Sequence, residues 1–312
     1  MNYVKYYYFD SYDDIYDIAP MVRNGTICTF LNCAIKFNLS NIDDYNIVLW
    51  VNGDNISKEN ARNIFERTSK ILSYLFMLPI HSQDIRVFDE EYAIETDKLL
   101  SKRNKKILLY IEHKIEKIKE DDFFNQVLDL MNIAIENLFK YRVEDAFFYF
   151  YKVIECIAVK YYKIYMDQNH KKTIEQNEKE ELKKILSKYF ENILGITFTE
   201  NLLDNKIGEI YKYIFDKVYG SSFSKIIFFI KKNNIKMGVD DIQKIVKVRN
   251  KIAHGDFIEE ETLITCLAIG ENLAVQMFSR QFFECEYGEI YMKSRRYRDK
   301  GSIYKIKKLK NR

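Results

Sequence analysis

The chain has 312 residues, of which 47% are hydrophobic and 30% are charged, and its formal net charge is +3. This length allows one large or two ordinary domains with well-filled cores. Its five cysteines are odd in number and scattered, without a Cys-x-x-Cys pair, which argues against a disulfide framework and against a zinc site. We therefore expect no metal and no cofactor. The absence of a signal-peptide pattern and of an apolar run of membrane-spanning length predicts a cytoplasmic protein without membrane contact.

The first hundred residues mix strand and helix patterns. Residues 25–37 and 46–51 are rich in β-branched and aromatic side chains and are bounded by turn residues, which predicts strands. Ser57 is a suitable N-cap for a helix that reaches about residue 77, and residues 85–95 can form another strand. We expect a small α+β module over residues 1–96. It lacks a glycine-rich phosphate loop and paired histidines, and sensing, docking or substrate selection is its expected role.

From residue 97 onward the apolar spacing is helical. Thr173 with Gln176, and Thr197 with Glu200, have the spacing of capping boxes. The fold class that we predict is α+β overall, in which the small module is followed by a mainly α-helical bundle over residues 97–286. The expected helices cover residues 97–119, 123–140, 144–167, 174–191, 199–219, 222–233, 239–254 and 260–284.

Residues 287–312 form a basic tail, in which residues 289–293 and 302–306 could pair as a hairpin. Residues 293–312 hold ten Lys or Arg and one acid, a net charge of +9, so the rest of the chain carries −6. Such a tail favours binding to a polyanion, with Arg295, Arg296 and Arg298 as candidate contacts. A solubilising tail without a ligand is the alternative.

The helix expected at 239–254 carries the most informative pattern, Arg249-Asn250-x-x-x-His254-Gly255. At 100° per residue from Ile242, Arg249 falls at about 340°, inside the apolar arc of the helix, where a cation is costly unless it is held. Asn250 and His254 lie four residues apart on one shoulder of that arc. Gly255 is a natural helix stop, which places His254 in the last turn.

These residues resemble the Arg-(four to six residues)-His signature of HEPN domains, in the form where Asn follows the Arg. An Apea-like subgroup is the nearest within that family. The resemblance implies a helical bundle that acts as a metal-independent ribonuclease in toxin–antitoxin, abortive-infection or other antiviral defence systems. It also implies a homodimer that joins two motifs, RNA as the substrate, and an antitoxin or other regulatory protein as a possible partner.

The residue types suit RNA cleavage without a metal. An imidazole moves protons near neutral pH, and its cationic form is favoured at a helix C-terminus. A guanidinium offers planar, permanently charged donors to phosphate oxygens, and an amide can orient either partner. We therefore predict that Arg249, Asn250 and His254 are catalytic. The resemblance implies products with 2′,3′-cyclic phosphate and 5′-hydroxyl ends. A histidine that only binds helix-end carbonyls is the structural alternative for His254.

Glu155 is the expected counter-charge for Arg249. It lies within the aromatic stripe of the helix expected at 144–167, flanked by Tyr151 and Tyr162. Two charges on apolar faces of separate helices are more plausibly facing each other than orphaned. The resemblance agrees, since HEPN domains often place an acidic or polar residue of an earlier helix beside the motif. A catalytic role for Glu155 and a purely structural ion pair remain equally open.

Further substrate contacts are possible at Tyr151, Lys247 and Lys251, although tyrosines at helical spacing are usually core and lysines usually solvated. No acidic cluster joins a His at ligand spacing and no Gly-x-Ser-x-Gly elbow occurs, which argues against a metal-dependent nuclease and a serine hydrolase. The alternative functions are a non-catalytic RNA-binding or protein-interaction module, and a nucleotide-sensing or nucleotide-transfer protein. ATP would thermally stabilise the last of these.

Overall fold

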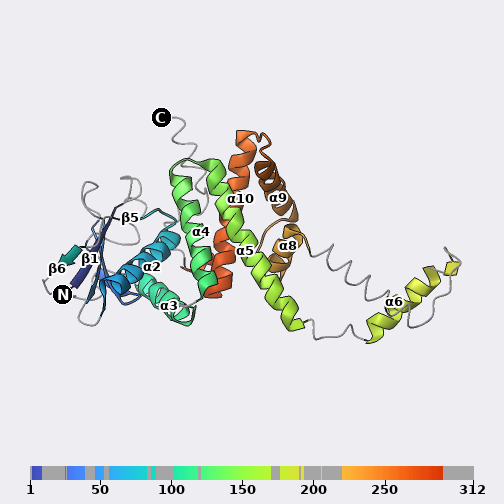
Figure 1. Ribbon diagram of the computed structural model, residues 1–312, viewed down its shortest axis with the longest axis horizontal. Coiled ribbons are helices and arrows are strands. Elements are labelled where there is room, and N and C mark those ends of the chain that lie inside the picture. Colours follow the sequence, from blue (N-terminus) through green and yellow to red (C-terminus); the bar gives the residue numbers. More distant parts are fainter. Residues whose placement is uncertain are drawn as a thin grey trace. The chain divides into compact units, whose positions relative to one another are not determined.

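The chain combines a β-sheet near its N-terminus with helices over most of its length, so the predicted α+β fold class is confirmed (Figure 1). The structure is a computed structural model of residues 1–312. It describes residues 2–8, 25, 27–38, 46–52, 56–82, 86–88, 102–118, 121–169, 176–189, 191–192, 205 and 220–290. Packing divides the chain into two compact units, Met1–Ile154 with Lys247–Arg312, and Glu155–Val246.

The strands of the first unit form one antiparallel sheet in the order β2-β3-β4-β1-β5, in which β6 also pairs with β1. The strands are β1 (Asn2–Tyr8), β2 (Ile27–Phe30), β3 (Cys33–Phe37), β4 (Ile47–Asn52), β5 (His81–Ser82) and β6 (Arg86–Phe88). Strand β1 is an interior strand that pairs with β4, β5 and β6, with Val4 opposite Trp50 of β4 and opposite Arg86 of β6. The predicted strand segment 25–37 is the hairpin β2–β3, whose two turn residues, Leu31 and Asn32, have positive φ.

Both faces of the sheet carry buried side chains, and alternate residues of each strand point to opposite faces. Helix α2 (Lys58–Phe76) packs on one face, where the buried Tyr7 hydroxyl donates to the Phe65 carbonyl at 3.1 Å. On the other face, Val4 and Trp50 belong to a small buried cluster. The Ser57 hydroxyl accepts from the Asn60 amide at 3.1 Å, which confirms Ser57 as the N-cap of α2.

Four longer helices complete the first unit with part of α9 (Val239–His254). They are α3 (Lys102–Ile118), α4 (Asp122–Phe139), the first turns of α5 (Val143–Asn169), and α10 (Glu260–Phe278). Helix α2 packs against α4, and the Tyr74 hydroxyl of α2 donates to the Val275 carbonyl of α10 at 3.1 Å. The boundary predicted at residue 96 therefore falls inside the first unit, because α2 shares its core with later helices.

Helix α10 continues into the π-helical turn η2 (Ser279–Phe283), and a short helix, α11 (Tyr287–Ile290), follows. The expectation of a strand at 289–293 is therefore wrong for residues 289 and 290. The Glu289 carboxylate accepts from the Glu286 amide at 2.8 Å, an interaction that stabilises the start of a helix. Residues 291–312, with the rest of the predicted hairpin, lie outside the described residues.

The continuous helix Glu260–Phe283 is long and apolar enough to cross a membrane by length and composition alone. This corrects the expectation that no segment reaches that length, which considered only unbroken apolar runs. More than half of its most apolar window is buried inside the protein. Its Phe278 ring lies 4.6 Å from that of Tyr74 and 6.0 Å from that of Phe124, which is typical of a core helix.

The second unit contains the remainder of α5, the first turns of α9, α6 (Gln176–Tyr189) and α8 (Ser222–Lys232). Aromatic side chains join α5 to α8: the Phe228 ring lies 4.8 Å from that of Tyr165 and 5.5 Å from that of Tyr162. The helix predicted at 199–219, with the capping box of Thr197 and Glu200, lies outside the described residues apart from residue 205.

Candidate active site

Helix α9 ends where the glycine signal predicted. Gly255 has φ +73°, and its amide donates to the Ile252 carbonyl at 3.1 Å. The next amide, of Asp256, donates to the Lys251 carbonyl at 2.9 Å. These two hydrogen bonds form a Schellman motif, whose left-handed residue is usually glycine. His254 is therefore the last residue of the helix, as expected.

The buried face of α9 is rotated from the arc that the sequence predicts. Ile242, Ile245 and Val248 are buried, whereas Ala253 is exposed. These three buried residues centre at about 300° on the helical wheel, which puts Arg249 about 40° and Ala253 about 80° away. Arg249 is accordingly half-buried at the edge of this face.

The guanidinium of Arg249 lies against an aromatic ring. Its central carbon is 5.5 Å from the centroid of the Tyr151 ring, within the range of a cation–π interaction. Its Nη1 donates to Oδ1 of Asn250 at 3.2 Å. Tyr151 is only 1% exposed, so its ring supports Arg249 and is not itself available as the substrate contact that the sequence allowed. Stacking and hydrogen bonding together limit where the guanidinium can point.

The other motif residues are open to solvent. Asn250 and His254 are exposed, and so are Lys247 and Lys251. The two lysines thus occupy the solvated side of α9. This position is expected both of surface residues without a ligand and of residues that contact a polyanion. The described structure therefore offers an accessible imidazole, an accessible amide and a partly buried guanidinium within two turns of one helix.

Glu155 is half-buried on α5, where its Oε1 accepts a hydrogen bond from the Ser222 hydroxyl at 2.5 Å. Ser222 is the first residue of α8, and both residues belong to the second unit. Arg249 belongs to the first unit. The pairing of Glu155 with Arg249 therefore stays a prediction.

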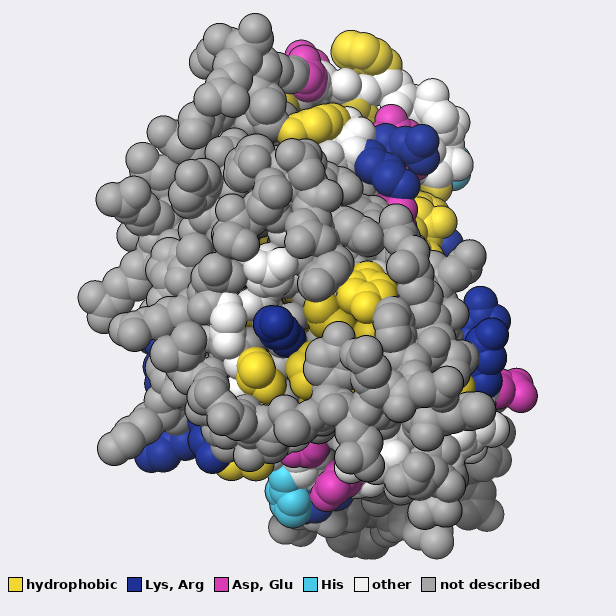
Figure 2. All heavy atoms as spheres, turned by 90° about the vertical axis from the view of Figure 1, so that its left-hand side faces the viewer, with side chains coloured by type: hydrophobic (Ala, Val, Ile, Leu, Met, Phe, Trp, Pro, Cys, Tyr) yellow, Lys and Arg dark blue, Asp and Glu magenta, His cyan; other side chains and the backbone are white. Residues whose placement is uncertain are grey.

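Arg295, Arg296 and Arg298 lie outside the described residues. On the face shown in Figure 2, described Lys and Arg side chains lie in separate groups with hydrophobic and acidic ones between them. Within the described residues, no group of three or more His, Cys, Asp or Glu side chains is placed to hold a metal ion.

A residue that the sequence analysis missed follows the motif directly. Phe257, in the loop between α9 and α10, is 86% exposed, the largest exposure among the described large hydrophobic residues. Its close neighbours in sequence include four exposed carboxylates, at Asp256, Glu259, Glu260 and Glu261. The available signal was a phenylalanine two residues after Gly255, which ends the helix. A side chain in such a loop can equally fold inward.

No family model matches the chain, and no curated protein or solved structure is significantly similar to it. The function is therefore argued from the residues of α9 and their surroundings.

Proposed function

We propose that the protein is a metal-independent endoribonuclease of the HEPN type, with Arg249, Asn250 and His254 as its catalytic residues. The observation that supports this most is the arrangement at the end of α9. The exposed His254 imidazole and Asn250 amide accompany the Arg249 guanidinium. This guanidinium lies over the Tyr151 ring and donates a hydrogen bond to Asn250. A permanent cation held at the rim of the core, with its polar companions facing solvent, suits a phosphodiester substrate.

RNA cleavage by the 2′-hydroxyl requires no metal ion. A base removes the proton of the 2′-hydroxyl, whose oxygen then attacks phosphorus. The bond from phosphorus to the 5′-oxygen breaks, and that oxygen takes up a proton. The products carry a 2′,3′-cyclic phosphate and a 5′-hydroxyl. Arg249 stabilises the charge that builds on the phosphoryl oxygens, His254 transfers a proton, and Asn250 orients the guanidinium through its 3.2 Å hydrogen bond.

One motif in the chain supplies one imidazole, whereas the reaction needs a proton acceptor and a proton donor. A homodimer in which two α9 C-termini share one cleft supplies both, and the exposure of His254 and Asn250 is compatible with that assembly. A role in antiviral defence, under the control of an antitoxin or another regulator, rests on the HEPN resemblance alone.

The test is cleavage of total RNA by the purified protein in excess EDTA. The wild type should cut RNA, and His254→Ala should lose at least about a hundredfold in rate, the usual contribution of a proton-transfer group. His113 is the matched control, because it is also an exposed helical histidine, on α3. Full activity of His254→Ala, or an equal loss in His113→Ala, would contradict the proposed role. Chelator-sensitive cleavage would contradict the metal-free reaction.

A second function, a protein-interaction module, is favoured by Phe257. The ring is 86% exposed, and the carboxylates around it repel phosphate and attract cations. A basic protein segment with an apolar anchor suits this loop better than RNA does. If this is the main function, Phe257→Ser will abolish complex formation seen by light scattering, and the wild type will bind without cleaving RNA.

A further inference from the structure

A hollow of about 740 Å³ lies in the first unit, between α3 and the segment that follows η2. Its apolar lining is formed by Ile107 and Tyr110 of α3 and by Cys285 and Ile290 beyond η2. Ile107, Cys285 and Ile290 are buried, while Tyr110 is 37% exposed and lies at the rim. The volume is in the range of small-molecule sites, about 300–1,000 Å³.

The backbone at one side of this hollow is unusual. Helix α10 passes into a π-helical turn, which is rare and frequently found at functional sites. Glu284, which caps that turn, has φ +55°, a left-handed conformation that non-glycine residues seldom adopt. This geometry brings Glu284 and Cys285 to the lining of the hollow.

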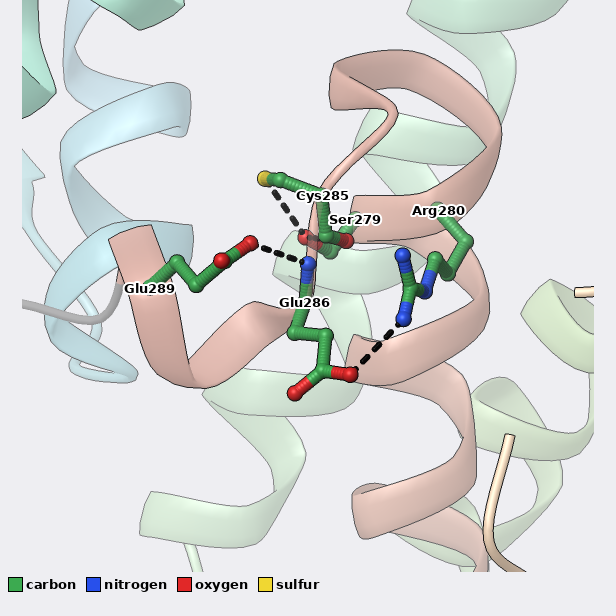
Figure 3. Close-up of polar contacts among 5 residues, drawn as sticks. All are labelled: Ser279, Arg280, Cys285, Glu286 and Glu289. Atoms are coloured by element: carbon green, nitrogen blue, oxygen red, sulfur yellow. Dashed lines mark hydrogen bonds and ion pairs between the residues drawn. The ribbon is translucent and has the colours of Figure 1, made fainter. Parts of the chain in front are cut away.

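A network of polar contacts holds the turn in place (Figure 3). The Ser279 hydroxyl donates to the Cys285 carbonyl at 2.9 Å, and Arg280 pairs with Glu286 at 2.9 Å. The Glu289 carboxylate accepts from the Glu286 amide at 2.8 Å. These contacts fix the wall before any ligand arrives, which lowers the entropic cost of binding.

Two cations and two carboxylates line the hollow, and both carboxylates already have partners. Glu284 already pairs with Lys114 at 2.5 Å, and Glu289 is engaged with the Glu286 amide. By contrast, Arg103 and Lys106 line the rim, and neither forms an ion pair within the described residues. Both belong to the first turns of α3, a position where the helix dipole disfavours cations and where helical amides seek acceptors.

We propose that this hollow binds a small organic anion with an apolar body, such as an alkyl carboxylate or an alkyl phosphate. The anionic group would lie between Arg103 and Lys106, and the apolar body would cover Ile107 and Ile290. An anion there neutralises two cations at the positive end of α3 and buries apolar surface at the same time. The two cations favour an anionic group and the isoleucines favour an apolar body, so the two features together favour a ligand that carries both.

The site is suited to binding and not to covalent reaction at its thiol. Burial raises the pKa of Cys285, so the sulfur stays protonated and weakly nucleophilic near neutral pH. The proposal is independent of the ribonuclease activity, because none of the lining residues belongs to α9.

The experiment is calorimetric titration of the full chain with decanoate, decyl phosphate and decan-1-ol, all below their aggregation limits. The two anions share the apolar body of the alcohol and distinguish a carboxylate site from a phosphate site. We expect at least one anion to bind about tenfold or more tightly than the alcohol, as a charge-assisted contact requires. Hydrogen exchange should slow on binding in α3 and in residues 284–290.

The variants Arg103→Gln and Lys106→Gln, combined, should remove this preference, whereas the control pair Lys105→Gln with Lys117→Gln should keep it. The control removes the same charge from exposed positions of the same helix that do not line the hollow. Equal binding of alcohol and anions by the wild type would overturn the proposal without any variant. An equal loss in both double variants, or exchange protection elsewhere in the chain, would overturn it too.

Discussion

Replacing Arg249 with Met separates a catalytic guanidinium from a structural one. Methionine keeps the unbranched apolar stem of the side chain and lacks the guanidinium, so the variant removes mainly the cation–π contact with Tyr151 and the hydrogen bond to Asn250. The cation–π contact contributes about 0.5–2 kcal/mol and the partly exposed hydrogen bond about 0.5–1 kcal/mol to the free energy of unfolding. The variant should therefore lose about 1–3 kcal/mol of stability.

Such a loss leaves the protein folded. From an initial stability of about 5 kcal/mol, the low end for natural domains, a loss of 3 kcal/mol still leaves about 97% of the molecules native. Cleavage, in contrast, should fall by about a hundredfold or more, because one donor to a developing phosphoryl charge typically contributes that much. The reduction in activity must then come from the lost guanidinium and not from unfolding.

Urea unfolding followed by circular dichroism measures the first quantity, and cleavage of a fluorescent RNA in EDTA measures the second. Arg62→Met is the control, because Arg62 is an exposed arginine of α2 whose ion pair among the described residues is with Glu66, at 3.3 Å. Cleavage by Arg249→Met within about threefold of the wild type would refute the catalytic role, since a hundredfold loss is expected. A stability loss well beyond 3 kcal/mol would instead assign Arg249 to the core.

Three further predictions follow from other contacts. Gly255→Ala places a residue with a Cβ at φ +73° and should lower the free energy of unfolding by about 1 kcal/mol. No heavy atom lies within 4 Å of that Cβ, so the loss would come from the backbone conformation alone, and an unchanged melting temperature would refute it. Burial raises the pKa of Tyr74, so the unfolded chain loses this phenolic proton first, and stability should fall as the pH rises above about 10. Tyr74→Phe also loses the 3.1 Å hydrogen bond to the Val275 carbonyl, which should lower the free energy of unfolding by about 1–2 kcal/mol. In this variant the urea midpoint should decline less steeply with pH than in the wild type. If the Glu155 carboxylate positions Arg249, Glu155→Gln should slow RNA cleavage. Ser222→Ala, which removes only the 2.5 Å hydrogen bond to Glu155, should not slow it. Equal cleavage rates of the wild type and both variants would exclude a positioning role for Glu155.

The helix that carries the candidate site could be predicted from local sequence. Its observed limits, Val239–His254, are those expected, and the amides of Gly255 and Asp256 end it by donating to carbonyls three and five residues earlier, respectively. Both features depend on interactions within one or two turns, which the sequence of those turns encodes. The same is true of Ser57, whose hydroxyl caps α2 three residues ahead.

Other features were decided by partners distant in the chain. Strand β1 was not predicted, although it pairs with three other strands, because its place depends on pairing with residues about forty or more positions later. A strand is defined by its neighbours, and no local rule specifies which segment will supply them. The short helix α11, by contrast, depends on a local contact: it occurs where a strand was expected, because the Glu289 carboxylate accepts from the Glu286 amide three residues earlier.

The sequence by itself determined which residues are grouped in the candidate site, since Arg249, Asn250 and His254 lie within the last two turns of one helix. Only the tertiary structure decided what each of them does there. The guanidinium is half-buried because the Tyr151 ring, almost a hundred residues away, lies 5.5 Å from it, and the imidazole is exposed because the buried face of α9 is turned toward Val248. Hydrogen bonds along a helix are local, whereas burial depends on every segment that packs against it.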